Sequence, residues 1–333
     1  MREINHASPP KVCFRRVDLY SFAGGCSSLM TSHPTSSPGL GNRLQSSLRV
    51  PPVGSRPLRR RLRAWRHWHR NRRHLERARQ DGSEVVLIHQ MGKVGSSSVK
   101  ETLQHVTGIT PIQTHWCNAD NLAHPAGIIN EKRRVSNRYG DRDHFGLMVH
   151  DRIIRTRAAS KVITMFRDPV ARNVSSYFQH LDEIWGVRQA HRRISINELQ
   201  RGFHETFEHD EPINWFNTEI RDVFGIDLFD HRFDHRTRWS QIDTRHWSVL
   251  VMRSDLTDAG KQQAVSSLLG RQIPALQRSN VGENKLYAEA YREFKSQICL
   301  SPDYLDRLYD TPVVRHFFSS EEIRSLRSRW MRG

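Results

Sequence analysis

The chain has 333 residues and a formal net charge of +17, with 52 Lys and Arg against 35 Asp and Glu. The charge is concentrated near the start, because residues 1–80 hold 17 of the basic residues and only 3 of the acidic ones. The remaining body is almost neutral, which excludes a protein that coats nucleic acid with its whole surface. A hydrophobic content of 37% excludes a wholly disordered chain.

Membrane and disulfide signals are weak throughout the sequence. No apolar run approaches the roughly 18 residues of a membrane-spanning helix, and none near the start has the continuous apolar core of about 7–15 residues that a signal peptide needs. Cys13, Cys26, Cys117 and Cys299 lie too far apart for a local redox pair or zinc cluster. Scattered cysteines are typical of a reducing compartment. We therefore expect a cytoplasmic protein without a metal site.

The first 80 residues divide into two parts. Residues 1–57 lack periodicity and become rich in Ser, Pro and Gly, which predicts a disordered leader. Residues 58–80 place Leu58, Leu62, Trp65 and Leu75 at helical intervals among arginines, which predicts a basic amphipathic helix. Such a helix could make peripheral contact with an anionic membrane, hold an acidic polymer, or pack against the following domain. The pattern leaves these alternatives open.

From residue 81 the pattern becomes that of an α/β domain, which we place at 81–333. Buried-strand patterns occupy 84–91, 146–150, 161–166 and 249–252. Helical patterns follow the first and third of these strands and end at about Val106 and Leu181. A third helical pattern occupies 257–269. Strands that alternate with helices predict a mostly parallel central sheet flanked by helices. Residues 182–240 are predicted to be mostly helical, and 284–330 to form two or three helices, the last opened by a capping box of Ser319 and Glu322.

The strongest local motif is GKVGSSS at 92–98, between a predicted strand and a predicted helix. Glycines allow backbone N–H groups to approach an anion, and the helix N-terminus adds unpaired donors and a positive dipole end. Lys93 would add a mobile positive charge. The lysine precedes Gly95, whereas the ATP-type P-loop places it after the last glycine. The motif therefore predicts a phosphate site of a different kind, unless it is one of the Gly- and Ser-rich turns with a lysine that occur by chance.

A second motif, Arg167-Asp168-Pro169, follows the predicted strand 161–166. Asp168 is placed as the N-cap of the next helix and Pro169 as its first residue. Arg167 is then at the carboxyl edge of the sheet, where open α/β sheets bind ligands. Together with Ser175, two helical turns later, it could hold a second phosphate. The alternative is that Arg167 pairs with a nearby carboxylate.

The two motifs, K-x-G-S-S and R-x-P-x5-S, resemble the two nucleotide loops of sulfotransferases that use 3′-phosphoadenosine 5′-phosphosulfate (PAPS). The body also resembles a bacterial group of capsular polysaccharide synthesis proteins. The similar segments are RDPVARNVSSYF (167–178), NWFNTEIRDVFGIDLF (214–229) and, more weakly, NVGENKLY (280–287) and HFFSSEEI (316–323). This resemblance spans about 84–330. It implies a P-loop-type three-layer fold with a helical acceptor-side insertion and C-terminal helices.

The resemblance also assigns roles to residues. In the family the first loop binds the 5′-phosphosulfate and the second binds the 3′-phosphate. Carried over, the 5′ end would be held by Gly92, Lys93, Val94, Gly95, Ser96, Ser97 and Ser98. The 3′-phosphate would be held by Arg167 and Ser175, with Arg278 and Asn280 closing over the nucleotide. Lys93 would also neutralise the leaving phosphate, and the chemistry requires no metal.

The acceptor hydroxyl needs a base, worth roughly 10²–10⁴-fold in rate. His150 ends the predicted strand 146–150, and in cytosolic sulfotransferases a histidine similarly ends the strand before the 3′-phosphate loop and serves as the base. The resemblance therefore implies His150, with His115, Asp151 and Glu219 as alternatives. The acceptor cleft is predicted to be lined by Trp215, Phe216 and Glu219, unless this segment is ordinary core packing.

The sequence therefore predicts a PAPS-dependent sulfotransferase that acts on a glycan hydroxyl, on a capsular or cell-surface polysaccharide. Its partners would be a nucleotide donor and a glycan acceptor, and no nucleic acid. One alternative is a P-loop nucleotide-dependent kinase, which the position of Lys93 disfavours. Another is a non-catalytic basic protein of polysaccharide synthesis that binds a polyanion or a membrane.

Overall fold

A computed structural model describes residues 66, 69, 72, 73, 75–119, 140–276 and 285–331. The chain divides into two units, 1–51 and 52–333, and every described residue belongs to the second. The predicted leader at 1–57 and two predicted nucleotide-binding residues, Arg278 and Asn280, lie outside the described residues.

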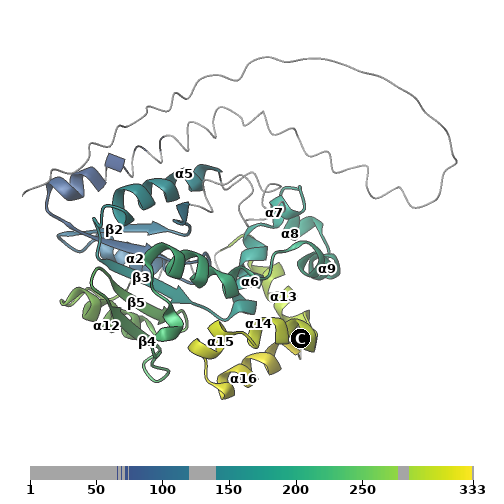
Figure 1. Ribbon diagram of the computed structural model, residues 1–333. Coiled ribbons are helices and arrows are strands. Elements are labelled where there is room, and N and C mark those ends of the chain that lie inside the picture. Colours follow the sequence, from purple (N-terminus) through teal and green to yellow (C-terminus); the bar gives the residue numbers. More distant parts are fainter. Residues whose placement is uncertain are drawn as a thin grey trace, which may run out of the picture. The chain divides into compact units, whose positions relative to one another are not determined.

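The described residues form an α/β structure around a five-stranded sheet (Figure 1). The strands are β1 (Glu84–His89), β2 (Ile109–Thr114), β3 (Lys161–Phe166), β4 (Trp239–Asp243) and β5 (Ser248–Arg253), in the order β2-β1-β3-β5-β4. All neighbours are parallel except β4, which runs antiparallel to β5 at one edge. In β1, β3 and β5 every residue after the first is buried, which explains their unbroken apolar sequences.

Those three strands were predicted, but the other two were not. Pro111 interrupts the apolar pattern of β2, and β4 is polar and partly exposed because it lies at the edge of the sheet. Both strands therefore lack the continuous apolar run by which their neighbours are recognised.

The prediction of a strand at 146–150 was wrong. This segment belongs to helix α5 (Gly140–Val149), which continues into a π-helical turn, η1 (His150–Ile154). A short apolar run suits a buried strand or one face of a buried helix equally well. Here Phe145, Met148 and Val149 are buried at the helical spacing of three and four residues.

Three helices connect or flank the strands as predicted. They are α2 (Ser97–Gln104), α6 (Pro169–Gln179) and α12 (Asp258–Leu269). Asp168 is the N-cap of α6, with Pro169 as the first helical residue, and its carboxylate accepts a hydrogen bond from the Val170 N–H at 3.1 Å. Gly108 has a φ of 72°, which places it in the left-handed region shortly after α2 and before β2.

The predicted helical region after α6 contains short elements. They are α7 (Leu181–Ile184), α8 (Ala190–Arg193), α9 (Ile196–Thr206), α10 (Glu211–Phe216), the π-helix η2 (Asn217–Arg221), α11 (Asp222–Phe224) and the 3₁₀ helix η3 (Leu228–Asp230). Because α10, η2 and α11 follow one another without a break, residues 211–224 form one continuous helical segment that changes its winding at η2.

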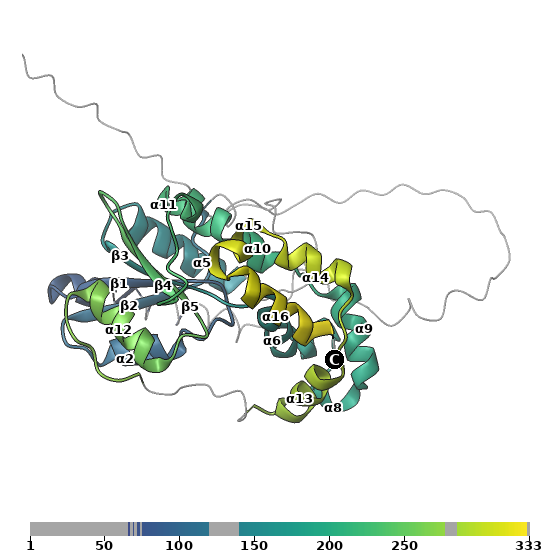
Figure 2. The same cartoon turned by 90° about the horizontal axis from the view of Figure 1, so that it is seen from below.

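The described C-terminal part has four helices, rather than the predicted two or three. They are α13 (Ala288–Gln297), α14 (Pro302–Tyr309), α15 (Pro312–Phe317) and α16 (Ser320–Met331). The capping box before α16 is confirmed, because the Glu322 N–H donates to the Ser319 hydroxyl and the Ser319 N–H to the Glu322 carboxylate. Figures 1 and 2 show these helices gathered with α6 and α9 at one end of the sheet.

The end of the basic helix packs onto this domain. Leu75 and Ala78 are each 3% exposed and belong to the core, whereas Arg66, Arg73 and Arg77 are exposed. This part of the helix therefore uses its apolar side for packing. Among the described residues, none of the helices combines the length and the apolar character needed to cross a membrane.

Candidate phosphate-binding site

The first motif forms the connection from β1 to α2, at the carboxyl edge of the sheet. Its backbone is left-handed at Lys93, with φ 73°, and at Gly95, with φ 84°. A left-handed lysine costs conformational energy, and such strain is concentrated at functional sites. The turn directs the chain so that Ser96, Ser97 and Ser98 begin the helix. Val94, Ser96 and Ser98 are buried, Gly92, Lys93 and Ser97 are partly exposed, and Gly95 is exposed.

The hydroxyl of Ser96 is held from two sides. The amide Nε2 of Gln113, on β2, donates to it at 2.8 Å, and the amide of Gln90, directly after β1, also donates to it. A hydroxyl oxygen has two lone pairs and one proton, so both lone pairs are used by these amides. The Ser96 proton is therefore available to a further acceptor, which suits an anion in this turn.

The second motif lies beside the first because β3 is the neighbour of β1. The Arg167 guanidinium donates to the Lys93 carbonyl at 2.9 Å. Arg172, one turn into α6 and 2% exposed, donates to the Gly92 carbonyl at 3.2 Å and pairs with Glu211. Ser175 lies on the next turn and is partly exposed. Two arginines thus join the two loops.

The charges around Lys93 are positive. Burial lowers the pKa of Lys93 to about 7, and three neighbouring cations contribute to the shift. These cations are Lys285, Arg167 and Arg172. The pKa of Lys295, on α13, is also lowered by burial and by Arg167. Cations that lower the pKa of one another are held together against repulsion, which an anion bound among them would relieve.

Sequence reasoning missed Arg172 and Lys285. Arg172 lies within the second motif, but the α6 sequence alone does not show that its side chain turns back to the first loop. Lys285 lies far along the chain, directly after the segment 277–284 that the structure does not describe, and only the fold brings it to Lys93.

His115, one of the alternative bases, lies next to the first loop. It follows β2 directly, and its Nδ1 is 2.8 Å from the carbonyl oxygen of Gln90. A carbonyl can only accept, so Nδ1 carries the proton and Nε2 of the neutral ring carries the lone pair. The Trp215 indole N–H donates to the backbone carbonyl of His115 at 3.0 Å, which fixes this position from the other side.

His150 and Asp151, in contrast, are not brought to the loops. Both lie in η1, at the end of α5, where the His150 ring is 3.4 Å from the Asp151 carboxylate. The Arg79 side chain, which precedes the amino end of β1, donates to the carbonyl of Arg152 in the same turn. Because the strands begin at this edge, His150 lies at the end of the sheet opposite to the two loops. The implied role of His150 relied on a strand that does not exist.

Glu219 is fully buried, and its carboxylate contacts groups of the protein itself. Its carboxylate is 3.2 Å from the His89 Nε2 and accepts from the backbone N–H groups of Cys117 at 2.7 Å and Asn118 at 3.1 Å. Burial opposes the charged form of His89, but Cys117 and Glu219 outweigh it and raise its pKa to about 10. Glu219 therefore joins the segment after His115 to the end of β1.

Trp215 and Phe216 are 1% and 2% exposed, and they pack in the core. The Trp215 ring lies 4.9 Å from the His89 ring, and Phe216 contacts Phe166 and Phe317. All three residues that were predicted to line an acceptor cleft, Trp215, Phe216 and Glu219, are buried, which fits the alternative of ordinary core packing. In the described part of the chain, no group of three or more His, Cys, Asp or Glu side chains is arranged to hold a metal ion.

One family of known proteins matches part of the chain. The family model NKWYS, described as "putative capsular polysaccharide synthesis protein", matches residues 191–319. The matched region runs from α8 to α15 and includes Glu219 and Lys285, but neither of the two loops at the carboxyl edge of β1 and β3. No curated protein and no solved structure matches the chain.

Proposed function

We propose that this protein is a PAPS-dependent sulfotransferase of P-loop type that acts on a hydroxyl of a glycan, in capsular polysaccharide synthesis. The observation that carries the proposal is the group of cations at the carboxyl edge of β1 and β3. Lys93, Arg167, Arg172 and Lys285 surround two loops of the kind that bind phosphates. The family match supports the glycan acceptor, since its description concerns capsular polysaccharide.

The donor carries phosphate at two positions, and the site has cations on two loops. The first loop would hold the phosphosulfate, with Lys93 and the N-terminus of α2 as donors. The 3′-phosphate would be bound by Arg167, with Arg172 and Lys285 adding positive charge. These cations would lower the barrier by neutralising charge on the leaving bisphosphate.

In this proposal His115 is the base, in place of His150. The acceptor oxygen forms a bond to sulfur while the bond from sulfur to the bridging phosphate oxygen breaks. The hydroxyl proton passes to Nε2 of His115, because Nδ1 already donates to the Gln90 carbonyl. The products are the sulfated glycan and adenosine 3′,5′-bisphosphate.

The proposal is tested by calorimetric titration with adenosine 3′,5′-bisphosphate and, separately, with ATP and Mg²⁺. We expect binding of the bisphosphate and much weaker binding of ATP. Lys93→Ala should weaken bisphosphate binding by about 10–100-fold, since a charge-assisted contact is lost. The matched control is Lys100→Ala on the adjoining helix α2, which should leave binding unchanged. Preference for ATP, or no binding of the bisphosphate, contradicts the proposal.

Bisphosphate affinity should also depend on pH. The pKa of Lys93 is about 7, so the lysine is already protonated below pH 7 and becomes neutral above it. A bound anion raises this pKa, so binding above pH 7 takes up a proton and weakens as the pH rises, by up to about tenfold per pH unit. Titrations at pH 6 to 9, in two buffers of different ionisation enthalpy, measure the affinity and the proton uptake. In Lys93→Met the dependence between pH 7 and 9 should disappear.

A further inference from the structure

The carboxylate of Asp168, directly after Arg167, is held by three elements. Its Oδ1 accepts from the Val170 N–H at 3.1 Å and from the Tyr309 hydroxyl, on α14, at 2.6 Å. Its Oδ2 accepts from the indole N–H of Trp330, on α16, at 3.2 Å. Asp168 is therefore more than a helix cap, because two C-terminal helices also bind it.

Both C-terminal donors are neutral and buried. Tyr309 is 0% exposed and Trp330 is 2% exposed. Burial raises the pKa of the Tyr309 hydroxyl, and the charge of Asp168 raises it further, so this group stays protonated and keeps donating. The hydrogen bonds to the Asp168 carboxylate thus come from neutral groups, and Lys295 acts on it only through its charge. The Arg167 guanidinium instead reaches the Lys93 carbonyl, at the anion site.

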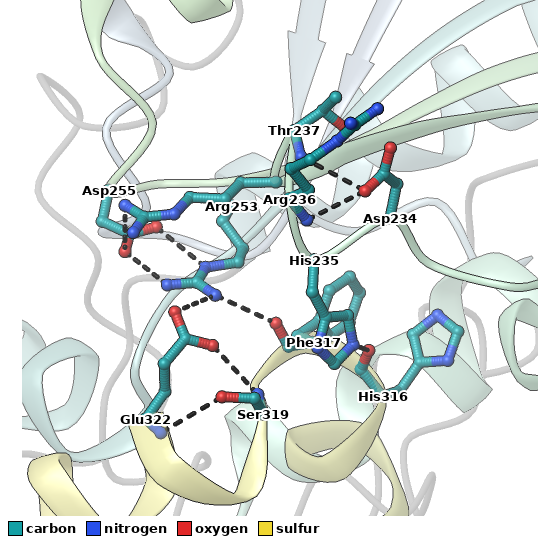
Figure 3. Close-up of polar contacts among 11 residues, drawn as sticks. Asp234, His235, Arg236, Thr237, Arg253, Asp255, His316, Phe317, Ser319 and Glu322 are labelled. Carbon is teal, nitrogen blue, oxygen red and sulfur yellow. Dashed lines mark hydrogen bonds and ion pairs between the residues drawn. The ribbon is translucent and has the colours of Figure 1, made fainter.

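Helix α16 is also fixed at its other end (Figure 3). Arg253, the last residue of β5, donates to the Glu322 carboxylate at 2.7 Å and to the Phe317 carbonyl at 3.3 Å, and pairs with Asp255. Arg253 is 2% exposed and lies 4.1 Å from the centre of the Phe318 ring. Since β5 is the neighbour of β3, α16 is fixed to the carboxyl ends of two adjacent strands.

We infer that Tyr309 and Trp330 are positioning residues for the second phosphate loop. Acting through Asp168, they fix the turn from which Arg167 reaches the anion, and so determine selectivity for a nucleotide with a second phosphate. This inference rests on the proposed function. Precise placement of a binding group requires support from rigid elements behind it, and α14 and α16 provide that support.

The test compares binding of adenosine 3′,5′-bisphosphate with binding of 5′-AMP, which lacks the second phosphate. In Tyr309→Phe, preference for the bisphosphate should fall about tenfold while 5′-AMP affinity is unchanged. Trp330→Phe should act in the same direction. The matched control is Tyr304→Phe, also on α14, whose hydroxyl is 2.7 Å from the His209 Nδ1 and also interacts with Asn173 of α6, so its hydrogen bonds are to these residues and not to the Asp168 carboxylate. It should leave the preference unchanged.

A second measurement does not depend on the nucleotide. Hydrogen exchange at the amides of Arg167, Asp168 and Val170 should become faster in Tyr309→Phe and stay unchanged in Tyr304→Phe. The inference is overturned if Tyr309→Phe lowers the affinity for both nucleotides equally, or if hydrogen exchange at these amides is unchanged. If the wild type itself shows no preference for the bisphosphate, the proposed function fails, and the exchange measurement still decides whether Tyr309 positions the loop.

Discussion

Replacing His115 by Asn should lower the kcat for sulfuryl transfer by about 10²–10⁴-fold, the usual contribution of a general base. Asparagine can still donate to the Gln90 carbonyl, as His115 Nδ1 does at 2.8 Å, so the local backbone should be retained. It has no group that can take the hydroxyl proton at neutral pH. The affinity for adenosine 3′,5′-bisphosphate should therefore change little, which separates loss of the base from loss of the donor site.

The matched control for this prediction is His150→Asn. His150 lies in η1, beside Asp151 and away from the phosphate loops, so its replacement should leave kcat unchanged. The measurement is the rate of transfer from radiolabelled PAPS to a panel of soluble capsular polysaccharides. If His150→Asn abolishes transfer and His115→Asn does not, the assignment of the base to His115 is wrong.

Replacing Glu219 by Ala should lower the free energy of unfolding by about 3–5 kcal/mol, the range for removal of one partner from a buried ion pair. The variant would leave the buried His89 ring and the N–H groups of Cys117 and Asn118 without the carboxylate that accepts from them. Urea unfolding measures the effect. The control is Asp222→Ala, an exposed carboxylate three residues later, which should cost less than about 0.5 kcal/mol.

This destabilisation should depend on pH. The pKa of His89 is raised from 6.5 to about 10 in the folded protein, so its contribution is fully present below pH 6.5 and lost as the pH rises through 10. Because the pKa of Lys93 is lowered, Lys93 makes the folded protein more stable as the pH rises over an overlapping range. Both wild type and the variant Glu219→Gln contain Lys93, so its contribution cancels in the difference between their free energies of unfolding. The difference between these two proteins should be largest at pH 6 and shrink towards pH 10. A difference that does not vary with pH would show that His89 and Glu219 are not a charged pair.

Predictions from the sequence succeeded where one local pattern has one structural solution. β1, β3 and β5 are mostly apolar runs of strand length, and all three lie inside the parallel sheet, where every residue after the first is buried. The cap of α6 is similarly local, since Asp168 and Pro169 both favour the start of a helix. In these places the physical cause acts over a few neighbouring residues.

Predictions failed where one local pattern fits more than one structure and contacts between distant residues decide which one forms. The run at 146–150 suits a strand or a helix, and burial of Phe145, Met148 and Val149 on one side decided for a helix. Because 146–150 was predicted to be a strand, His150 at its end was expected to be the base. In the structure, the histidine that follows a strand directly and lies next to the first loop is His115, behind β2, whose apolar pattern Pro111 interrupts. For Trp215 the sequence left an acceptor cleft and core packing both open, because a sequence does not show which side of a helix is covered, and in the structure its side chain is buried.

The net charge illustrates the same division. By itself, the sequence determined that the charge of +17 belongs mostly to residues 1–80, and that Lys93 and Arg167 each follow a strand, because both are properties of order along the chain. Only the tertiary structure decided that Arg172 and Lys285 join them, and that Asp168 is held by Tyr309 and Trp330. Parallel pairing of β1 and β3 brings the loops together, and packing of the C-terminal helices supplies the remaining partners. Such contacts depend on the whole fold, because residues more than 70 positions apart must meet.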